Sequence, residues 1–320
     1  MKINLKCLTF LMTYKCTSEC KHCLYRASPY QDNLISLKDV KRDLRNLKSI
    51  HSIDSIYFFG GEPLLYFELL VSLIQEVKKL EIPNWETIGI ITNGFWGKND
   101  SVAKKYAKGL KEAGLNSFVI SVDAFHQEFV PIDAVKGTIR AAKEVGIEWI
   151  KINGKSFGDT EANNHYNQQT KRLIKELEQE FDVDEIDVRP LMVAGRAADT
   201  LAKYLPMIEL TSVKCKRDDI RNPTYIEIDP NGWVWICCGI AIGNTRKTSI
   251  SEIIRGYEYK KHPILCRIGD KEPVGLLELA IEKGYKPLNG YAGRCHLCFS
   301  VRRFLRPFYP EILVPAHVYQ

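Results

Sequence analysis

Three cysteines close together near the start of the chain are the residues best suited to chemistry. Cys16, Cys20 and Cys23 stand in a C-x3-C-x2-C array. Three thiolates at this spacing can bind three irons of a [4Fe–4S] cube and leave the fourth iron open to a small molecule. A structural zinc site is one alternative, but such sites usually close with four ligands, and His22 would have to be the fourth. A loose cluster of surface cysteines is the other alternative, and the spacing favours iron and sulfur.

A glycine-rich turn follows an apolar run further along the chain. The run 56–59 leads directly into Gly60, Gly61 and Glu62, with Pro63 after them. A glycine at the end of a buried strand lets a ligand approach the backbone closely, because it has no side chain. Together with the cysteine array, and in this order, the turn resembles the radical SAM superfamily. In that family three cysteines hold the cluster, the amino and carboxylate groups of S-adenosylmethionine (SAM) chelate the open iron, and the glycine turn closes over the methionyl amine.

A second set of cysteines lies in the last third of the chain. Its members are Cys215, Cys237, Cys238, Cys266, Cys295 and Cys298. Cys295 and Cys298 form a bidentate unit that Cys237 and Cys215 can complete, with Cys266 competing for the place of Cys215. Four thiolates close a [4Fe–4S] cluster, which then binds no SAM, whereas a zinc ribbon would use the same ligands. Because an oxygen-labile cluster is already predicted, we favour an auxiliary [4Fe–4S] cluster here.

Two adjacent cysteines have different expected roles. Neighbouring side chains on a strand point to opposite faces, so Cys237 can ligate the auxiliary cluster while Cys238 points toward the mouth of the barrel. A thiol is a good hydrogen-atom donor because its S–H bond is weak. The alternative is that Cys238 is a small buried apolar residue, as free cysteines often are.

These residues follow a regular alternation of elements. Strands are predicted over 3–12, 54–59, 87–92, 117–122, 147–152 and 185–188, and helices over 37–47, 65–80, 100–113, 134–145 and 166–180. The pattern predicts an α/β fold, a partial (β/α)6 TIM-like barrel, with the motifs at the carboxyl ends of the parallel strands. After Pro190 the alternation stops. Strands 224–229 and 233–237 then flank a turn, and a helix is expected over 274–284. We therefore predict a barrel domain over 1–205 and a small auxiliary-cluster domain over 206–320.

Composition limits the function classes. The chain has 320 residues, of which 45% are hydrophobic and 26% are charged, with a net charge of +6. These values are ordinary for a globular protein. No apolar run is long enough to span a membrane, and the basic residues are spread out, so neither membrane nor nucleic-acid binding is expected. Ten cysteines without a secretory signal indicate a cytoplasmic protein that uses thiols for metal or redox chemistry.

The whole chain resembles radical SAM enzymes with a short auxiliary domain of the SPASM/twitch type. More narrowly, it is similar to the peptidyl epimerases that convert L- to D-residues in epipeptides. The matching stretches are 93–97, Ser121 and Asp123 with His126, 129–130, the Cys237–Cys238 pair, and Cys295 to Cys298 with Phe299 after it.

The resemblance implies a mechanism and its partners. Reductive cleavage of SAM gives a 5′-deoxyadenosyl radical, which takes the Cα hydrogen of an L-residue in a ribosomally made precursor peptide. Cys238 returns a hydrogen from the opposite face, and a second [4Fe–4S] cluster, attached through Cys237, helps to re-reduce the thiyl radical. The electrons come from a donor such as flavodoxin or ferredoxin.

The resemblance also implies contacts to SAM. Ser121 and Asp123 would bind the ribose or the carboxylate, and Arg189 would pair with the methionyl carboxylate. The full set of implied contacts is His22, Gly60, Gly61, Glu62, Asn93, Ser121, Asp123 and Arg189. The basic tail with Arg302, Arg303 and Arg306 is expected to contact the substrate. Two other readings stay open: a maturase that forms thioether or carbon–carbon crosslinks in a peptide, and a zinc-binding interaction protein without catalysis.

Overall fold

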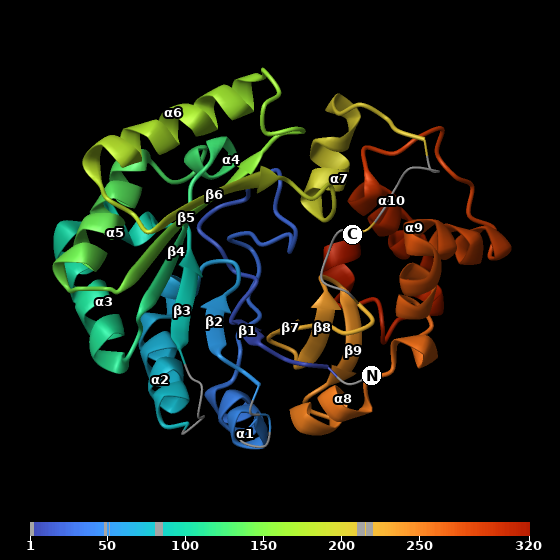
Figure 1. Cartoon of the computed structure of the whole chain (residues 1–320), viewed down its shortest axis with the longest axis horizontal. Helices are drawn as coiled ribbons and strands as arrows, with labels where there is room; N and C mark the ends of the chain where they lie inside the picture. Colours follow the sequence, from blue (N-terminus) through green and yellow to red (C-terminus); the bar gives the residue numbers. More distant parts are fainter. Residues whose placement is uncertain (1–2, 48–49, 51, 81–85, 210–214, 216–219) are drawn as a thin grey trace.

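A computed structural model describes residues 3–47, 50, 52–80, 86–209, 215 and 220–320. Its centre is a nine-stranded sheet in the order β6-β5-β4-β3-β2-β1-β7-β8-β9 (Figure 1). The strands are β1 (Cys7–Leu11), β2 (Ser55–Phe59), β3 (Thr87–Thr92), β4 (Ser117–Ser121), β5 (Trp149–Ser156), β6 (Glu185–Pro190), β7 (Tyr225–Ile228), β8 (Trp233–Cys237) and β9 (Ile240–Asn244). The first six run parallel to their neighbours. The predicted strands are thus confirmed, with ends that differ by a few residues.

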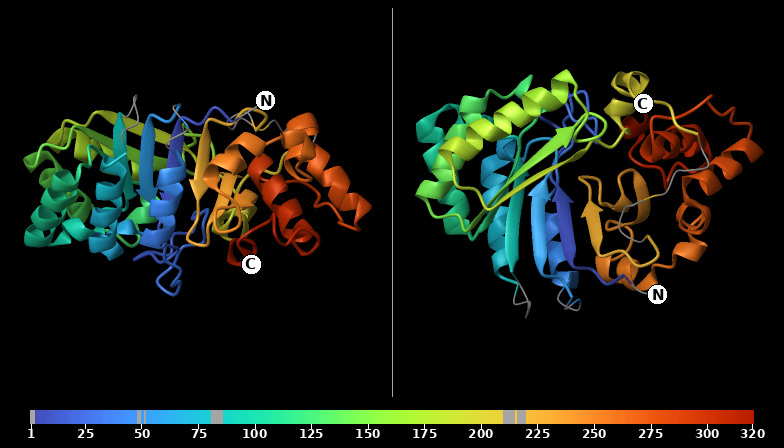
Figure 2. Two further views of the ribbon diagram at one scale, coloured as in Figure 1. Left: turned by 90° about the horizontal axis from the view of Figure 1, so that it is seen from below. Right: turned by 45° about the horizontal axis from the view of Figure 1, so that its top comes forward.

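Helices between these strands cover the outer face of the curved sheet (Figures 1 and 2). They are α1 (Leu37–Leu47), α2 (Phe67–Lys78), α3 (Asp100–Ala113), the short α4 (Ala124–Gln127), α5 (Ile132–Glu144) and α6 (His165–Glu180). Local signals set their ends: in α3 the side chain of Asn99 accepts from the backbone of Val102, and Gly114 ends the helix in the left-handed conformation. Parallel strands with helices outside form the predicted partial barrel.

The C-terminal region extends the same sheet. β7 pairs in parallel with β1, with Cys7 opposite Tyr225 and Phe10 opposite Ile228, and β8 and β9 follow as antiparallel strands. The predicted hairpin of β7 and β8 is confirmed, whereas β9 was not predicted. Since the sheet runs through both regions, the domain boundary at residue 205 stays a prediction.

The remaining helices lie toward the β9 end of the sheet, with α8 (Ile250–Gly256) in contact with α1 (Figure 1). They are α7 (Arg196–Thr200), α8, α9 (Leu265–Glu282) and α10 (Arg294–Leu305), with 3-10 turns at Pro63–Tyr66, Phe95–Lys98, Ala202–Tyr204, Tyr259–Lys261, Arg306–Phe308 and Ala316–Tyr319. The predicted helix 274–284 is the second half of α9, which is kinked at Lys271 and Glu272 just before Pro273. Among the described helices, none is long and apolar enough to cross a membrane.

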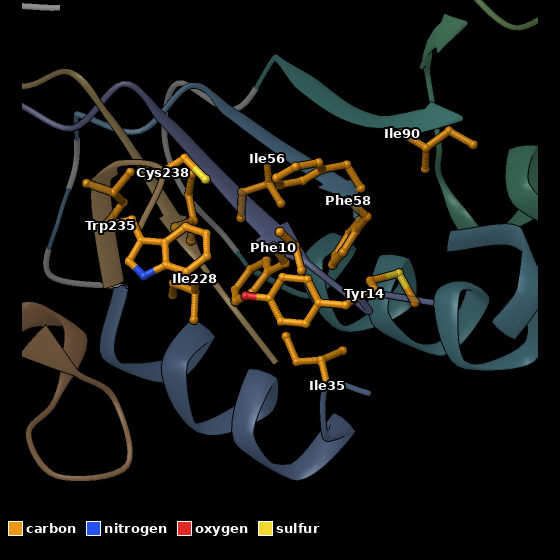
Figure 3. Packing of buried hydrophobic residues seen from close by; sticks show 14 of the residues in the cluster. Phe10, Tyr14, Ile35, Ile56, Phe58, Ile90, Ile228, Trp235 and Cys238 are labelled. Carbon is orange, nitrogen blue, oxygen red and sulfur yellow. The ribbon is translucent and has the colours of Figure 1, made fainter. Parts of the chain in front are cut away.

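The core joins the barrel to the C-terminal hairpin. Phe10 and Phe58 stack between β1 and β2 with ring centroids 5.6 Å apart, and Trp235 of β8 is fully buried. Figure 3 shows Trp235 and Cys238 in the same buried cluster as Phe10 and Tyr14. Packing therefore continues from the first strand of the barrel to the second cysteine set.

Candidate active site

A cavity lies where the parallel strands of the barrel end. The loop after β1, the strands β2 to β5 and β7, and the residues just after β6 line it. It contains most of the predicted site residues: Cys16, Cys20, His22, Cys23, Gly60, Gly61, Asn93 and Ser121. Cys16, Cys20 and Cys23 are the only cysteines among the described residues that line this cavity. The donor set thus fits a [4Fe–4S] cluster that keeps one iron open to a ligand.

The glycine turn is fastened to the backbone that leads into the cysteine loop. Gly61 donates its N–H to the carbonyl of Thr13 over 2.6 Å, and Glu62 donates to that of Lys15 over 2.9 Å. A Cβ atom on Gly60 would lie 2.5 Å from the carbonyl oxygen of Thr13, and one on Gly61 would lie 2.0 Å from that of Lys15. Both positions therefore require glycine because the turn packs directly against this backbone. The sequence had instead suggested that the glycines make room for a ligand.

Glu62 lies beneath the cavity and does not line it. Its fully buried carboxylate accepts hydrogen bonds from the backbone of Leu64 (3.0 Å), the hydroxyl of Thr92 (2.9 Å) and the backbone of Asn93 (2.8 Å). Burial raises the pKa of Glu62 to about 7, although the hydrogen bonds oppose this shift. Glu62 thus holds the end of β3 in place.

Asn93 connects β3 to the cysteine loop. Its side-chain nitrogen donates to the hydroxyl of Thr17 over 3.0 Å and lies 3.8 Å from the sulfur of Cys16. Its side-chain oxygen accepts from the backbone of Phe95 over 3.0 Å. Trp96, which follows, belongs to the core: it is 2% exposed and donates to Thr92. Asn93 is therefore the member of the predicted 93–97 stretch that faces the site.

Two histidines share one buried carboxylate at the edge of the cavity. Asp123 is fully buried and caps α4, and its Oδ2 lies 3.0 Å from Nδ1 of His126 and 3.9 Å from Nε2 of His22. The three ligand atoms lie within 4.8 Å of one another, close enough to ligate a single ion. Both histidines line the cavity, whereas Asp123 does not. Burial lowers the pKa of His22 to about 3, so that its imidazole is neutral at physiological pH.

Arg189 is not brought to the cavity. Its side chain is 69% exposed and pairs with Asp187 over 2.8 Å. Among the described residues, Lys155 of β5 is the only lysine or arginine that lines the cavity. Its ammonium group donates to the side-chain oxygen of Asn153 over 3.2 Å. Burial lowers the pKa of Lys155. Asn153 and Lys155 are two residues apart, so both lie on the inner face of β5, which extends beyond the predicted strand end at residue 152.

Arg196 also belongs to the site, and nothing in its sequence context indicated this. It begins α7, and its guanidinium donates to the carbonyls of Cys20 (2.8 Å) and Ala27 (2.9 Å). Its own N–H donates to the carbonyl of Cys23 over 3.0 Å. One residue from beyond the barrel therefore fixes the second half of the cysteine loop, from Cys20 to Ala27.

The second cysteine set lines a neighbouring cavity. Cys215, Cys237, Cys238, Cys295 and Cys298 all lie on its wall. Cys266 does not, and its sulfur faces the carbonyl of Pro263 at 3.7 Å. The geometry therefore groups Cys215 with the other thiols. Leu24 and Met192 line both cavities, so the two sites share a wall.

The spacing of the thiols bears on the choice of metal. Sulfurs that bind one tetrahedral zinc ion at about 2.3 Å lie roughly 3.8 Å apart. In the described residues, no three cysteine sulfurs come within 4.8 Å of one another, because the one group that does so is the histidine–aspartate set. The thiols that line each cavity are therefore not drawn together as around one zinc ion, and their donor types suit iron–sulfur ligation.

Cys238 occupies the turn that joins β8 to β9, together with Gly239 at φ +79°. Cys238 is 3% exposed, and its sulfur lies 3.9 Å from the carbonyl oxygen of Leu24, the residue after Cys23. It lines the same cavity as Cys237. The expected alternation between opposite faces is wrong here, because β8 ends at Cys237. The thiol nevertheless lies against the first cysteine loop.

Comparisons with known proteins agree with this geometry. Residues 10–157 match the model of the Radical SAM superfamily, and this part of the chain is a radical SAM domain, whose family uses SAM and a [4Fe–4S] cluster. YydG of Bacillus subtilis (strain 168), named for peptide biosynthesis, is 24% identical over 254 residues, covering 79% of this chain and 75% of YydG.

Two further comparisons concern an enzyme and a solved structure. The GTP 3′,8-cyclase of Peptoclostridium acidaminophilum is 27% identical over 237 residues, which cover 68% of this chain and 66% of the cyclase. The structure of anSMEcpe with bound AdoMet and the Kp18Cys peptide superposes with a TM-score of 0.56 at 15% identity, covering 96% of this chain and 97% of that one. The latter likeness concerns the fold alone.

Proposed function

We propose that this protein is a radical SAM peptide epimerase, which converts L- to D-residues in a ribosomally made peptide. The observation that carries the proposal is the position of Cys238. Its thiol lines the second cavity and lies 3.9 Å from the carbonyl oxygen of Leu24, a residue that lines both cavities. The similarity to YydG, a protein named for peptide biosynthesis, supports a peptide as the substrate.

The chain's own residues have defined tasks in the first cavity. Cys16, Cys20 and Cys23 hold a [4Fe–4S] cluster, and Lys155, rather than Arg189, pairs with the methionyl carboxylate of SAM. Asn93 and Arg196 keep the cysteine loop in its conformation. When bound, the cluster and SAM would supply a 5′-deoxyadenosyl radical. This radical would take the Cα hydrogen of the substrate residue and so become 5′-deoxyadenosine.

Cys238 completes the reaction by returning a hydrogen atom. Its S–H bond breaks as a new Cα–H bond forms on the opposite face, which leaves a D-residue and a thiyl radical. One electron and one proton restore the thiol, so each turnover consumes one SAM, two electrons and one proton. Cys215, Cys237, Cys295 and Cys298 would hold an auxiliary [4Fe–4S] cluster, which would supply the second electron from a flavodoxin or ferredoxin.

The test is anaerobic turnover in D2O with a small peptide encoded beside this gene. Wild type is compared with Cys238→Ala and with Cys266→Ala, a control that alters a thiol outside both cavities. We expect wild type and Cys266→Ala to add one mass unit per modified residue and to form D-residues. Cys238→Ala should still release 5′-deoxyadenosine but form no D-residue. Loss of two hydrogens, or a new crosslink, would instead assign the protein to the crosslinking maturases.

A further inference from the structure

Arg302 is a buried cation next to the second cysteine set. The sequence placed it in a basic tail that faces the substrate, but on α10 it is only 3% exposed. It lines the second cavity. Its guanidinium donates to the carbonyl of Cys238 over 2.7 Å, to that of Cys298 over 3.4 Å and to the hydroxyl of Tyr319 over 3.0 Å. The arginine therefore contacts both the proposed hydrogen donor and a proposed cluster ligand.

Among the residues that the structure describes, none places a carboxylate beside Arg302. Within the described residues, no aspartate or glutamate oxygen comes within 4.0 Å of its guanidinium, whereas its neighbour Arg303 pairs with Asp199 at 2.8 Å. The rings of Phe299 and Tyr319 lie 5.8 and 5.6 Å from the guanidinium carbon. Burying a charge without a counter-ion is unfavourable, and the described residues give Arg302 only neutral acceptors, so an anion bound in the cavity would stabilise it.

The thiols around the cavity can provide that anion. Four thiolates on a [4Fe–4S] cluster give it a net negative charge, and reduction adds one more. A fixed cation stabilises the reduced form more than the oxidised form, because its attraction grows with the negative charge.

We propose that Arg302 is the counter-charge of the auxiliary cluster and raises its reduction potential, while the same guanidinium holds the backbone of Cys238 in place. This inference rests on the second cluster of the proposed function. The charge of Arg302 would make the cluster easier to reduce, and this cluster lies beside Cys238, the thiol that must be re-reduced.

The experiment measures that potential directly. The substitutions Cys16→Ala, Cys20→Ala and Cys23→Ala leave only the second site able to hold a cluster, which is titrated by EPR at controlled potentials. Arg302→Gln should lower the ratio of reduced to oxidised cluster at a fixed potential by about tenfold, equal to 59 mV for one electron. Arg302→Lys, which keeps the charge, should stay within about threefold of the parent. Arg303→Gln is the matched control on the same helix and should leave the ratio unchanged.

Other outcomes separate this inference from the proposed function. Equal potentials for the parent, Arg302→Gln and Arg302→Lys, with full iron content, would overturn the role of Arg302 and leave the second cluster standing. A parent without iron would overturn both the second cluster and this inference, while the radical SAM domain would remain. If Arg302→Gln cannot hold a cluster, the iron content of Arg302→Lys tests the proposal. Iron retained in Arg302→Lys supports the counter-charge role, and iron lost from both variants overturns it.

Discussion

At the residue scale, Asn93 is the side chain that binds the cysteine loop to the barrel. We predict that Asn93→Asp and Asn93→Ala both weaken the first cluster, because each removes the donor to Thr17 beside Cys16. One lost hydrogen bond of about 1 kcal/mol corresponds to about fivefold faster release of iron to a chelator. The rate is measured anaerobically in a Cys295→Ala, Cys298→Ala background. The exposed Asn163→Asp is the control, and unchanged iron release in Asn93→Ala would contradict the prediction.

A second residue, Asp229, makes stability depend on pH. It is 1% exposed in the turn between β7 and β8, where it accepts from the hydroxyl of Tyr14 and from the backbones of Asn231 and Trp233. Burial raises the pKa of Asp229 to about 6. This value lies above the unfolded pKa of about 3.9, so the folded state binds more protons in between, and stability falls as the pH rises from about 4 to about 6.

The Asp229→Asn substitution should remove this dependence. Its Oδ1 can keep both backbone hydrogen bonds, and no charge then has to be buried above pH 6. From about pH 5 to about pH 7.5, wild type should lose about 1 kcal/mol of unfolding free energy relative to Asp229→Asn. Urea unfolding of both proteins at each pH measures the difference, and the comparison cancels any effect of acid on the clusters. Parallel curves for the two proteins would show that Asp229 titrates normally.

At the scale of elements, α7 holds the cysteine loop from outside the barrel. We predict that Arg196→Met removes the guanidinium donor from the carbonyls of Cys20 and Ala27, of which Cys20 keeps the N–H of Cys23, and lowers the unfolding free energy by about 1–3 kcal/mol. The first site should also lose iron while the second site retains it. Thermal unfolding and iron counts in the two single-site backgrounds measure both effects. Arg172→Met, on the exposed face of α6, is the control. Equal iron loss from both sites would mean a general loss of stability.

The elements also indicate what could be predicted from the sequence. The barrel strands and helices were predictable because hydrophobic periodicity, an Asn cap at α3 and a Gly stop after it agree with one another. The cysteine sets were found by spacing. Arg196, Lys155 and the burial of Arg302 were not predicted, because each depends on contacts between segments far apart in the chain. The turn at Cys238 was missed because β9 was not recognised as the partner of β8.

At the scale of the whole molecule, the two cysteine sites depend on one sheet. β7 forms a ladder with β1, and β1 leads directly into the first cysteine loop, while β8 leads into Cys237. Leu24 and Met192 line both cavities. A change in the position of the hairpin would therefore move Cys238 relative to the first site, so in the proposed mechanism the sheet would set the distance between the hydrogen donor and the first site.

This continuity predicts that the barrel and the C-terminal hairpin unfold together. Trp96 in the barrel is 2% exposed and Trp235 in β8 is fully buried, so each reports on one region. In protein labelled with fluorotryptophan, both fluorine NMR signals should lose their folded positions at the same urea concentration, as in a two-state transition. Trp96→Phe and Trp235→Phe assign the two signals. If the Trp235 signal changed at a clearly lower urea concentration, the C-terminal region would be a separate folding unit, and the pairing of β7 with β1 would contribute little to holding Cys238 beside the first site.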